Sequence, residues 1–129
     1  MSRKELQQLR PVIASIDEAA SITPEEQFQN SILRPILKFQ NPLLLQIYCH
    51  YLEQRKGQFY KLPNAKEKFA YIQHSIQKDS KLRELLMGVV IGHFTEEEYS
   101  SFLKREKAIR KRILNLMVQR IQDQMEDLR

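Results

Sequence analysis

Apolar residues recur every three or four positions along most of the chain, which is the spacing of an α-helix with one buried face. Strand-forming residues are few, since Val and Thr together number six. After Thr23 the spacing predicts a helix over residues 24–40. Its apolar positions continue past the end of that helix and are Phe28, Ile32, Ile36, Phe39 and Leu43. Because Pro35 lacks a backbone N–H, we expect this helix to bend near Arg34 and Pro35.

Three further helices follow from the same pattern. Asn41 and Pro42 are typical of a cap followed by a first-turn proline, and they predict a helix that ends at Gly57. After a loop over residues 58–64, a helix is predicted over 65–78 and another over 80–91. The latter is apolar over most of its circumference, so we expect it at the centre of the core. These apolar residues are Leu82, Leu85, Leu86, Val89, Val90 and Ile91.

The last helix is predicted to run without interruption from residue 96 to about 127, because no proline or glycine occurs there. It begins with Thr95 and Glu98, which have the spacing of a capping box, as do Thr23 and Glu26. Such a helix is about 48 Å long, whereas a compact domain of this size is roughly 35 Å across. Its end must fray, be covered by neighbours, or overhang and need a partner for Ile121, Met125 and Leu128.

These elements predict an all-α fold in a single domain. We expect four main helices plus a short N-terminal element, with the long C-terminal helix packed across the others. Residues 1–22 are interrupted by Arg10 and Pro11, and they are predicted to form an N-terminal arm or short helix. Residues 23–129 are predicted to form the helical domain.

Composition and the lengths of the apolar segments predict the class of protein and its location in the cell. The 129 residues are 42% hydrophobic and 29% charged, which is typical of a folded domain and excludes intrinsic disorder. The longest apolar stretch, residues 85–91, is too short to cross a membrane, and the polar N-terminus shows no signal-peptide pattern. Cys49 is the single cysteine and has no internal disulfide partner. A cytoplasmic protein without membrane contact is therefore predicted.

The net charge of +5 comes from one run, residues 104–112, which holds six basic residues and one acidic residue. The remaining chain has 15 residues of each sign, because 21 minus six and 16 minus one both leave 15. Helical geometry places most of this run opposite Phe102 and Ile109, which favours a solvated face over a binding surface. Glu106 and Arg110 are predicted to pair across one turn. The residues predicted to face solvent are Lys104, Arg105, Lys107, Lys111 and Arg112.

Two kinds of site are disfavoured by spacing. A helix-turn-helix over residues 85–103 would present Glu96, Glu97 and Glu98 to DNA, and these carboxylates repel phosphates. His50, His74 and His93 lie on separate segments without the spacing that places two metal ligands on one helix face. We therefore predict no metal and no other cofactor, and we expect nucleic-acid binding to be possible but disfavoured.

A dense polar set surrounds the expected bend at Pro35. A bent helix frees a carbonyl, which such side chains can satisfy, so a structural hydrogen-bond network is the favoured interpretation. A ligand pocket is the alternative. The set comprises Gln29, Asn30, Arg34, Gln40 and Asn41.

Residues 28–40 (FQNSILRPILKFQ) and 92–99 (GHFTEEEY) resemble a group of short, uncharacterised, all-helical bacterial proteins, some of which carry an automatic glyoxalase label. The likeness covers most of the chain from about residue 20. It implies a bacterial cytoplasmic origin and brings no catalytic residues. The common metal-dependent glyoxalases use paired βαβββ modules with His and Glu ligands on strands, and this sequence predicts neither.

Three functional hypotheses follow. The first is a non-enzymatic interaction protein that self-associates, as a homodimer, or binds a partner through its C-terminal helix at Ile121, Met125 and Leu128. The second is nucleic-acid or acidic-partner binding through residues 104–112, principally through Lys104, Lys107 and Lys111. The third is a small ligand-binding protein or enzyme built around Arg34 and the histidines.

Overall fold

The structure is a computed structural model that describes residues 1–12 and 23–127. All regular structure in these two ranges is helical, so the predicted all-α fold is confirmed. In chain order the elements are α1 (Arg3–Gln8), α2 (Pro24–Phe28), the π-helix η2 (Gln29–Leu33), α3 (Arg34–Gln54), the 3₁₀ turn η3 (Phe59–Lys61), α4 (Ala65–Lys78), α5 (Ser80–Ile91), α6 (Glu96–Lys104), α7 (Glu106–Asp123) and the 3₁₀ turn η4 (Met125–Asp127).

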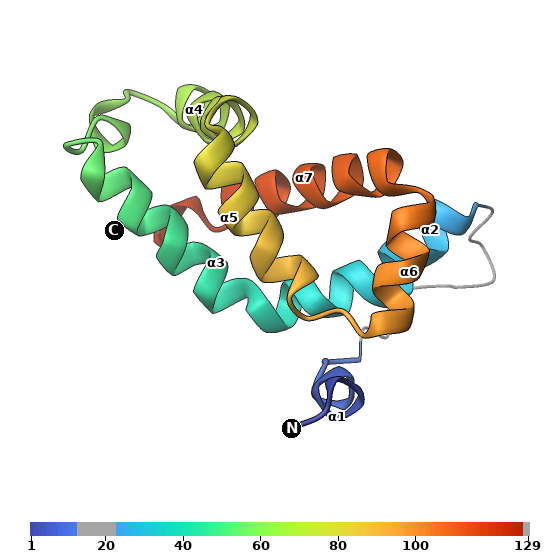
Figure 1. Cartoon of the computed structure of the whole chain (residues 1–129). Coiled ribbons are helices and arrows are strands. Elements are labelled where there is room, and N and C mark those ends of the chain that lie inside the picture. The colour runs from blue at the N-terminus through green and yellow to red at the C-terminus, as the bar shows by residue number, and fades with distance from the viewer. Residues whose placement is uncertain (13–22, 128–129) are drawn as a thin grey trace.

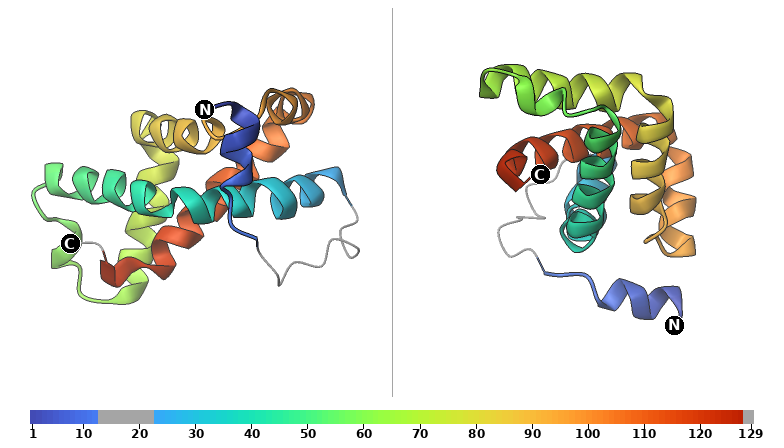
Figure 2. Two further views of the ribbon diagram at one scale, coloured as in Figure 1. Left: turned by 90° about the horizontal axis from the view of Figure 1, so that it is seen from below. Right: turned by 90° about the vertical axis from the view of Figure 1, so that its left-hand side faces the viewer.

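The long helices cross one another around a single core (Figures 1 and 2). Helix α3 packs along α5, while α7 contacts α2, α4, α5 and α6, so the C-terminal helix packs across the others as expected. The predicted bounds of α4 and α5 are confirmed. Helix α5 buries Leu82, Leu86 and Val90, but Leu85 is 55% exposed. The side of α5 that carries Leu85 therefore faces solvent. The predicted position of α5 at the centre of the core is wrong.

The bend before Pro35 takes the form of a π-helix. The N–H of Arg34 donates to the carbonyl of Gln29, five residues back, so the hydrogen-bond pattern changes just before the proline that cannot donate. The predicted break at residues 41–42 is wrong, because α3 continues through Pro42 to Gln54. Pro42 and Lys38 are exposed, so water can satisfy the carbonyl that loses its partner.

The single helix predicted over residues 96–127 is also wrong, because the chain leaves helical geometry at Arg105 (φ −137°, ψ 38°). Helices α6 and α7 then bury separate apolar faces, with Phe102 on the first and Ile109 on the second. The division removes the length mismatch that called for a partner. Ile121 is 1% exposed, and Met125 packs against the core.

The other predicted helix ends are explained by capping. Thr95 and Glu98 form the complete capping box of α6, and the Thr23 hydroxyl accepts from the N–H of Glu26 at 3.1 Å. The helix predicted to reach Gly57 ends at Gln54 instead. Lys56 and Gly57 follow with positive φ values of 57° and 73°, and they reverse the chain direction.

Candidate functional site

A groove of about 530 Å³ is lined by residues of α3 and α5. Leu43, Ile47 and Tyr51 lie at helical spacing along its α3 wall, and Leu82 and Leu85 lie on the α5 wall. Leu43 is 44% exposed and Leu85 is 55% exposed, although both are large and apolar. Two opposite walls therefore present apolar surface to solvent, which is typical of a site that binds another apolar surface.

This groove continues into a second hollow of about 600 Å³ that is lined in part by α4. The two hollows share Tyr51, Arg55, Asp79 and Lys81, so together they form one surface, here named the α3–α5 groove. Its apolar end consists of Leu43, Ile47, Leu82 and Leu85. Its basic end consists of Arg55, His74, Lys78, Asp79 and Lys81.

The basic end carries an excess of positive charge. Asp79 is the one carboxylate among the lining residues that the structure describes, and it is already engaged. It accepts from the N–H of Leu82 at 3.1 Å as the cap of α5, and from Arg55 at 2.8 Å. Lys78 and Lys81 are exposed beside this pair. The groove therefore offers two ammonium groups to a negatively charged partner.

Hydrogen bonds fix Ser75, which lines the second hollow of the groove. The Tyr48 hydroxyl lies 2.7 Å from the Ser75 hydroxyl, which in turn donates to the carbonyl of Ile72 at 2.9 Å. Tyr48 is fully buried, and this burial raises the pKa of its hydroxyl. Arg55 lies over an aromatic ring, since its guanidinium carbon is 4.6 Å from the centre of the Tyr51 ring. A hydrogen bond to Tyr51 raises the pKa of Arg55.

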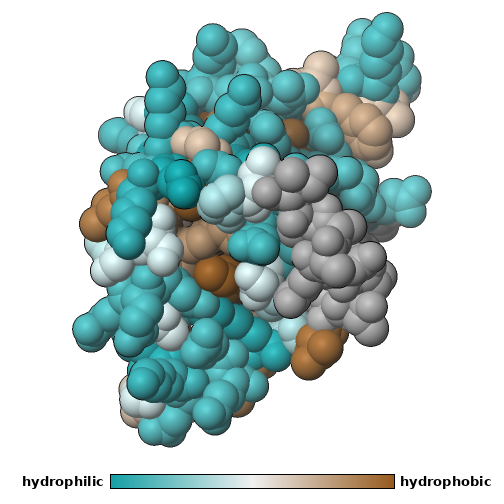
Figure 3. All heavy atoms as spheres, turned by 90° about the vertical axis from the view of Figure 1, so that its right-hand side faces the viewer, coloured by the Kyte–Doolittle hydropathy of each residue, from teal (hydrophilic) through white to brown (hydrophobic). Residues whose placement is uncertain are grey.

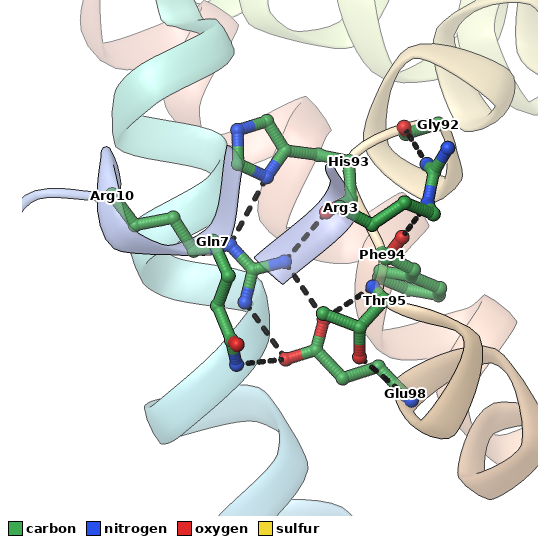
Figure 4. Close-up of polar contacts among 8 residues, drawn as sticks. All are labelled: Arg3, Gln7, Arg10, Gly92, His93, Phe94, Thr95 and Glu98. Atoms are coloured by element: carbon green, nitrogen blue, oxygen red, sulfur yellow. Dashed lines mark hydrogen bonds and ion pairs between the residues drawn. The ribbon is translucent and has the colours of Figure 1, made fainter. Parts of the chain in front are cut away.

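A second polar cluster lies where the N-terminal segment meets the corner between α5 and α6 (Figure 4). Arg10 donates to both carboxylate oxygens of Glu98 at 2.7 Å, and its Nε donates to Nδ1 of His93 at 3.0 Å. The Arg10 and Glu98 side chains are only 6% and 8% exposed. Arg3 donates to the carbonyls of Gly92 and Phe94. Among the described residues only Nε2 of His93 is buried without a hydrogen-bond partner, and the other contacts fasten the N-terminal segment to the domain.

Stability is expected to fall as the pH drops, because of this cluster. Burial lowers the pKa of His93 below its usual 6.5, and the charge of Arg10 lowers it further. Burial alone would raise the pKa of Glu98, but hydrogen bonds from Arg10 and Thr95 outweigh it and hold that pKa below the usual 4.5. Both groups therefore bind fewer protons in the folded chain than in the unfolded chain, so acid favours unfolding.

The free energy of unfolding should be greatest above pH 6.5, should fall first through His93, and should fall below pH 4.5 through Glu98 as well. Urea unfolding at several pH values measures this profile. The variant His93→Gln should lose the upper part of the decline, while His50→Gln, at an exposed site, should keep it. Identical pH profiles of stability for the parent and His93→Gln would contradict the role of His93 in this decline.

The basic run over residues 104–112 is partly engaged within the protein. Arg105 lies 3.7 Å from Glu25, and Arg112 donates to Gln29 at 2.9 Å and is half-buried rather than on a solvated face. Arg110 pairs with Glu84 of α5 instead of the predicted Glu106. Lys104, Lys107 and Lys111 remain exposed. The face that carries α6 and the start of α7 is mainly hydrophilic (Figure 3), as expected for a solvated surface.

The polar set around Pro35 does not converge on one pocket. Arg34 donates to Asn30 at 3.2 Å, and Gln40 donates to the carbonyl of Val89 at 3.1 Å. Asn41 exchanges two hydrogen bonds with Gln124, the residue that follows α7, at 2.7 and 2.6 Å. Together with the bond between Gln29 and Arg112, these contacts tie α3 and the π-helix to α5 and α7. Arg34 also lines a cavity against α7.

The remaining candidate residues are dispersed. His50 and His74 line opposite ends of the α3–α5 groove, whereas His93 is buried in the Arg10 cluster. Within residues 1–12 and 23–127, no three His, Cys, Asp or Glu side chains are grouped to hold a metal ion. Leu128 lies outside the described residues.

Comparison with protein families, curated proteins and solved structures found no match to this chain. The likeness to short bacterial proteins and their glyoxalase label therefore stays a prediction from sequence. None of the helices in the described part of the chain has the length and apolar character needed to span a bilayer.

Proposed function

We propose that this chain is a non-enzymatic binding protein whose α3–α5 groove takes up an amphipathic helix from a protein partner, with acidic residues on that helix. The observation that carries the proposal is the union of an exposed apolar end and a basic end in one continuous groove. We keep the predicted interaction function, but we propose α3 and α5 as the binding surface in place of the C-terminal helix.

The apolar end supports a helical occupant. Leu43, Ile47 and Leu82 can contact residues spaced three and four apart on one face of a helix laid between α3 and α5. Leu85 adds an exposed side chain at the rim. Burial of one such leucine contributes about 1.5–3 kcal/mol, so a few contacts of this kind are enough for specific binding.

The basic end supports an acidic occupant. Lys78 and Lys81 have no carboxylate partner among the described residues, whereas Asp79 is paired with Arg55. Charges at the rim of an interface steer association and exclude partners of like charge. A partner helix with acidic residues beyond its apolar face would meet both ends of the groove at once.

The other predicted surfaces are less well supported. Ile121 is buried and Met125 packs against the core, so self-association through the C-terminal helix would have to disrupt the domain. Internal contacts engage the three arginines of the run over residues 104–112, which leaves its three lysines for a partner. A bacterial cytoplasmic location is part of the proposal and rests on the sequence.

A synthetic peptide tests the proposal directly. The probe is an amphipathic peptide of about 18 residues, or five helical turns, with leucines on one face and glutamates beside them. Fluorescence anisotropy measures its binding. The parent should bind it more tightly than a matched peptide with lysines in place of the glutamates, and Leu85→Glu should weaken binding at least about 10-fold.

Two matched controls separate the groove from general effects. Leu103 is 49% exposed on α6, outside the groove, so Leu103→Glu should leave peptide binding unchanged. Lys81→Glu should weaken binding of the acidic peptide, while Lys104→Glu should not. Absence of binding, or equal losses in Leu85→Glu and Leu103→Glu, would overturn the proposal. Dimerisation that Leu85→Glu abolishes would assign the groove to a second copy instead.

A further inference from the structure

A separate cavity of about 300 Å³ lies between the start of α3 and the end of α7. Arg34 and Arg120 both line it, from opposite helices, together with Asp123, Gln119 and Gln124. Leu37 and Leu116 supply an apolar wall. This volume is at the lower end of the range for small-molecule sites. The cavity shares no lining residue with the α3–α5 groove.

The two arginines bring like charges together in a half-buried place. Burial lowers the pKa of Arg120, and the positive charge of Arg34 lowers it further, while Asp123 acts in the opposite direction. Neither guanidinium forms an ion pair with a carboxylate within residues 1–12 and 23–127. Two partly desolvated cations without a paired anion destabilise a fold, and such arrangements are typical of functional sites.

Hydrogen bonds orient two of the side chains that line this cavity, Arg34 and Gln124. Asn30 accepts from Nε of Arg34 at 3.2 Å, which leaves the Nη groups of Arg34 for another acceptor. The amide of Gln124 is fixed by Asn41 at 2.7 and 2.6 Å and donates to the carbonyl of Arg120 at 3.0 Å. Arg34 and Gln124 are therefore already oriented without a ligand.

We propose that this cavity binds the phosphate group of a small phosphate ester between Arg34 and Arg120. A phosphate monoester has three terminal oxygens and two negative charges, so it can face guanidinium groups from two different helices. A single carboxylate carries one negative charge, so it balances only one of the two guanidinium groups. Asp123 and Gln119 are placed to bind hydroxyl groups on the rest of the ligand.

Calorimetric titration with glycerol phosphate tests this site in the whole chain. The parent should bind glycerol phosphate at constant ionic strength, and chloride or acetate should not replace it. Arg34→Gln and Arg120→Gln should each weaken binding at least about 10-fold, the loss expected when one charged hydrogen-bond donor is removed. At ten times its dissociation constant, the ligand should reduce the unfolding constant of the parent about 10-fold.

Stability without ligand distinguishes a binding role from a structural one. Since each variant removes one of two like charges, both should be at least as stable as the parent when no phosphate is present. Arg112→Gln is the matched control, because Arg112 lies on α7 but bonds to Gln29 outside the cavity; it should bind the ligand normally. Lack of binding by the parent, equal binding of acetate, or loss of stability in both cavity variants would overturn the proposal.

Discussion

Replacing Glu98 by alanine is expected to destabilise the protein by about 3–5 kcal/mol, the usual cost of breaking a buried ion pair from one side. Glu98 accepts two hydrogen bonds from Arg10, one from Gln7 at 3.3 Å and one from the N–H of Thr95 at 2.9 Å. Its loss leaves the Arg10 guanidinium without a counter-charge and removes half of the capping box of α6. Urea unfolding measures the change.

The matched control is Glu97→Ala, which changes an exposed carboxylate in the same helical turn. It should alter stability by no more than about 0.5 kcal/mol. Release of the N-terminal segment should accompany the Glu98 change, so trypsin should cut after Lys4 faster than in the parent. Equal stabilities for the two variants would show that the Arg10 cluster does not fasten the segment.

Replacing Phe94 by alanine is expected to destabilise the protein by about 3–5 kcal/mol, the usual cost of deleting a buried phenylalanine ring. The ring is 2% exposed and contacts Phe28 of α2 and Phe102 of α6, with ring centres 5.6 and 5.8 Å away. It therefore joins α2 to α6 and to the turn that precedes α6.

Tyr99→Ala is the comparison for this change. Tyr99 stacks on Phe102 at 5.9 Å but is 44% exposed, so its loss should cost clearly less. Thermal unfolding of both variants measures the difference. A Phe94→Ala protein as stable as Tyr99→Ala would contradict the position of this ring in the core.

Local signals were sufficient to predict α4 and α5. Asn64 and Asp79 each cap a helix with their own side chain, accepting from Glu67 at 2.9 Å and from Leu82 at 3.1 Å. These bonds join residues three apart, so the sequence alone contains both partners. The capping box at Thr95 is predictable for the same reason.

The predicted helix bounds near Pro42 and Arg105 are wrong because tertiary packing overrides local preference there. Pro42 looks like a helix start, but Leu44 and Leu37 are both buried on one face of α3, and this packing favours one continuous helix. Arg105 is a good helix former, yet the helix is interrupted there because α6 and α7 pack in different directions. No residue near Arg105 signals that change.

The arginine cavity and the α3–α5 groove are only partly predictable from the sequence. Arg34 belongs to the polar set that the sequence singled out, but its counterpart Arg120 is 86 positions away along the chain and has no local signal. The apolar pattern predicts buried positions for Leu43 and Leu85, because apolar spacing does not distinguish a core position from the wall of an open groove. The basic end likewise forms only when α3, α4 and α5 meet.

Chemical-shift mapping with the acidic amphipathic peptide tests the central proposal most directly. Backbone amide signals of the parent are followed by NMR as the peptide is added. The proposal predicts shifts concentrated on the walls of the α3–α5 groove, around Leu43, Ile47, Lys81 and Leu85. Shifts confined to residues 104–112 or to the end of α7, with the groove unchanged, would contradict it.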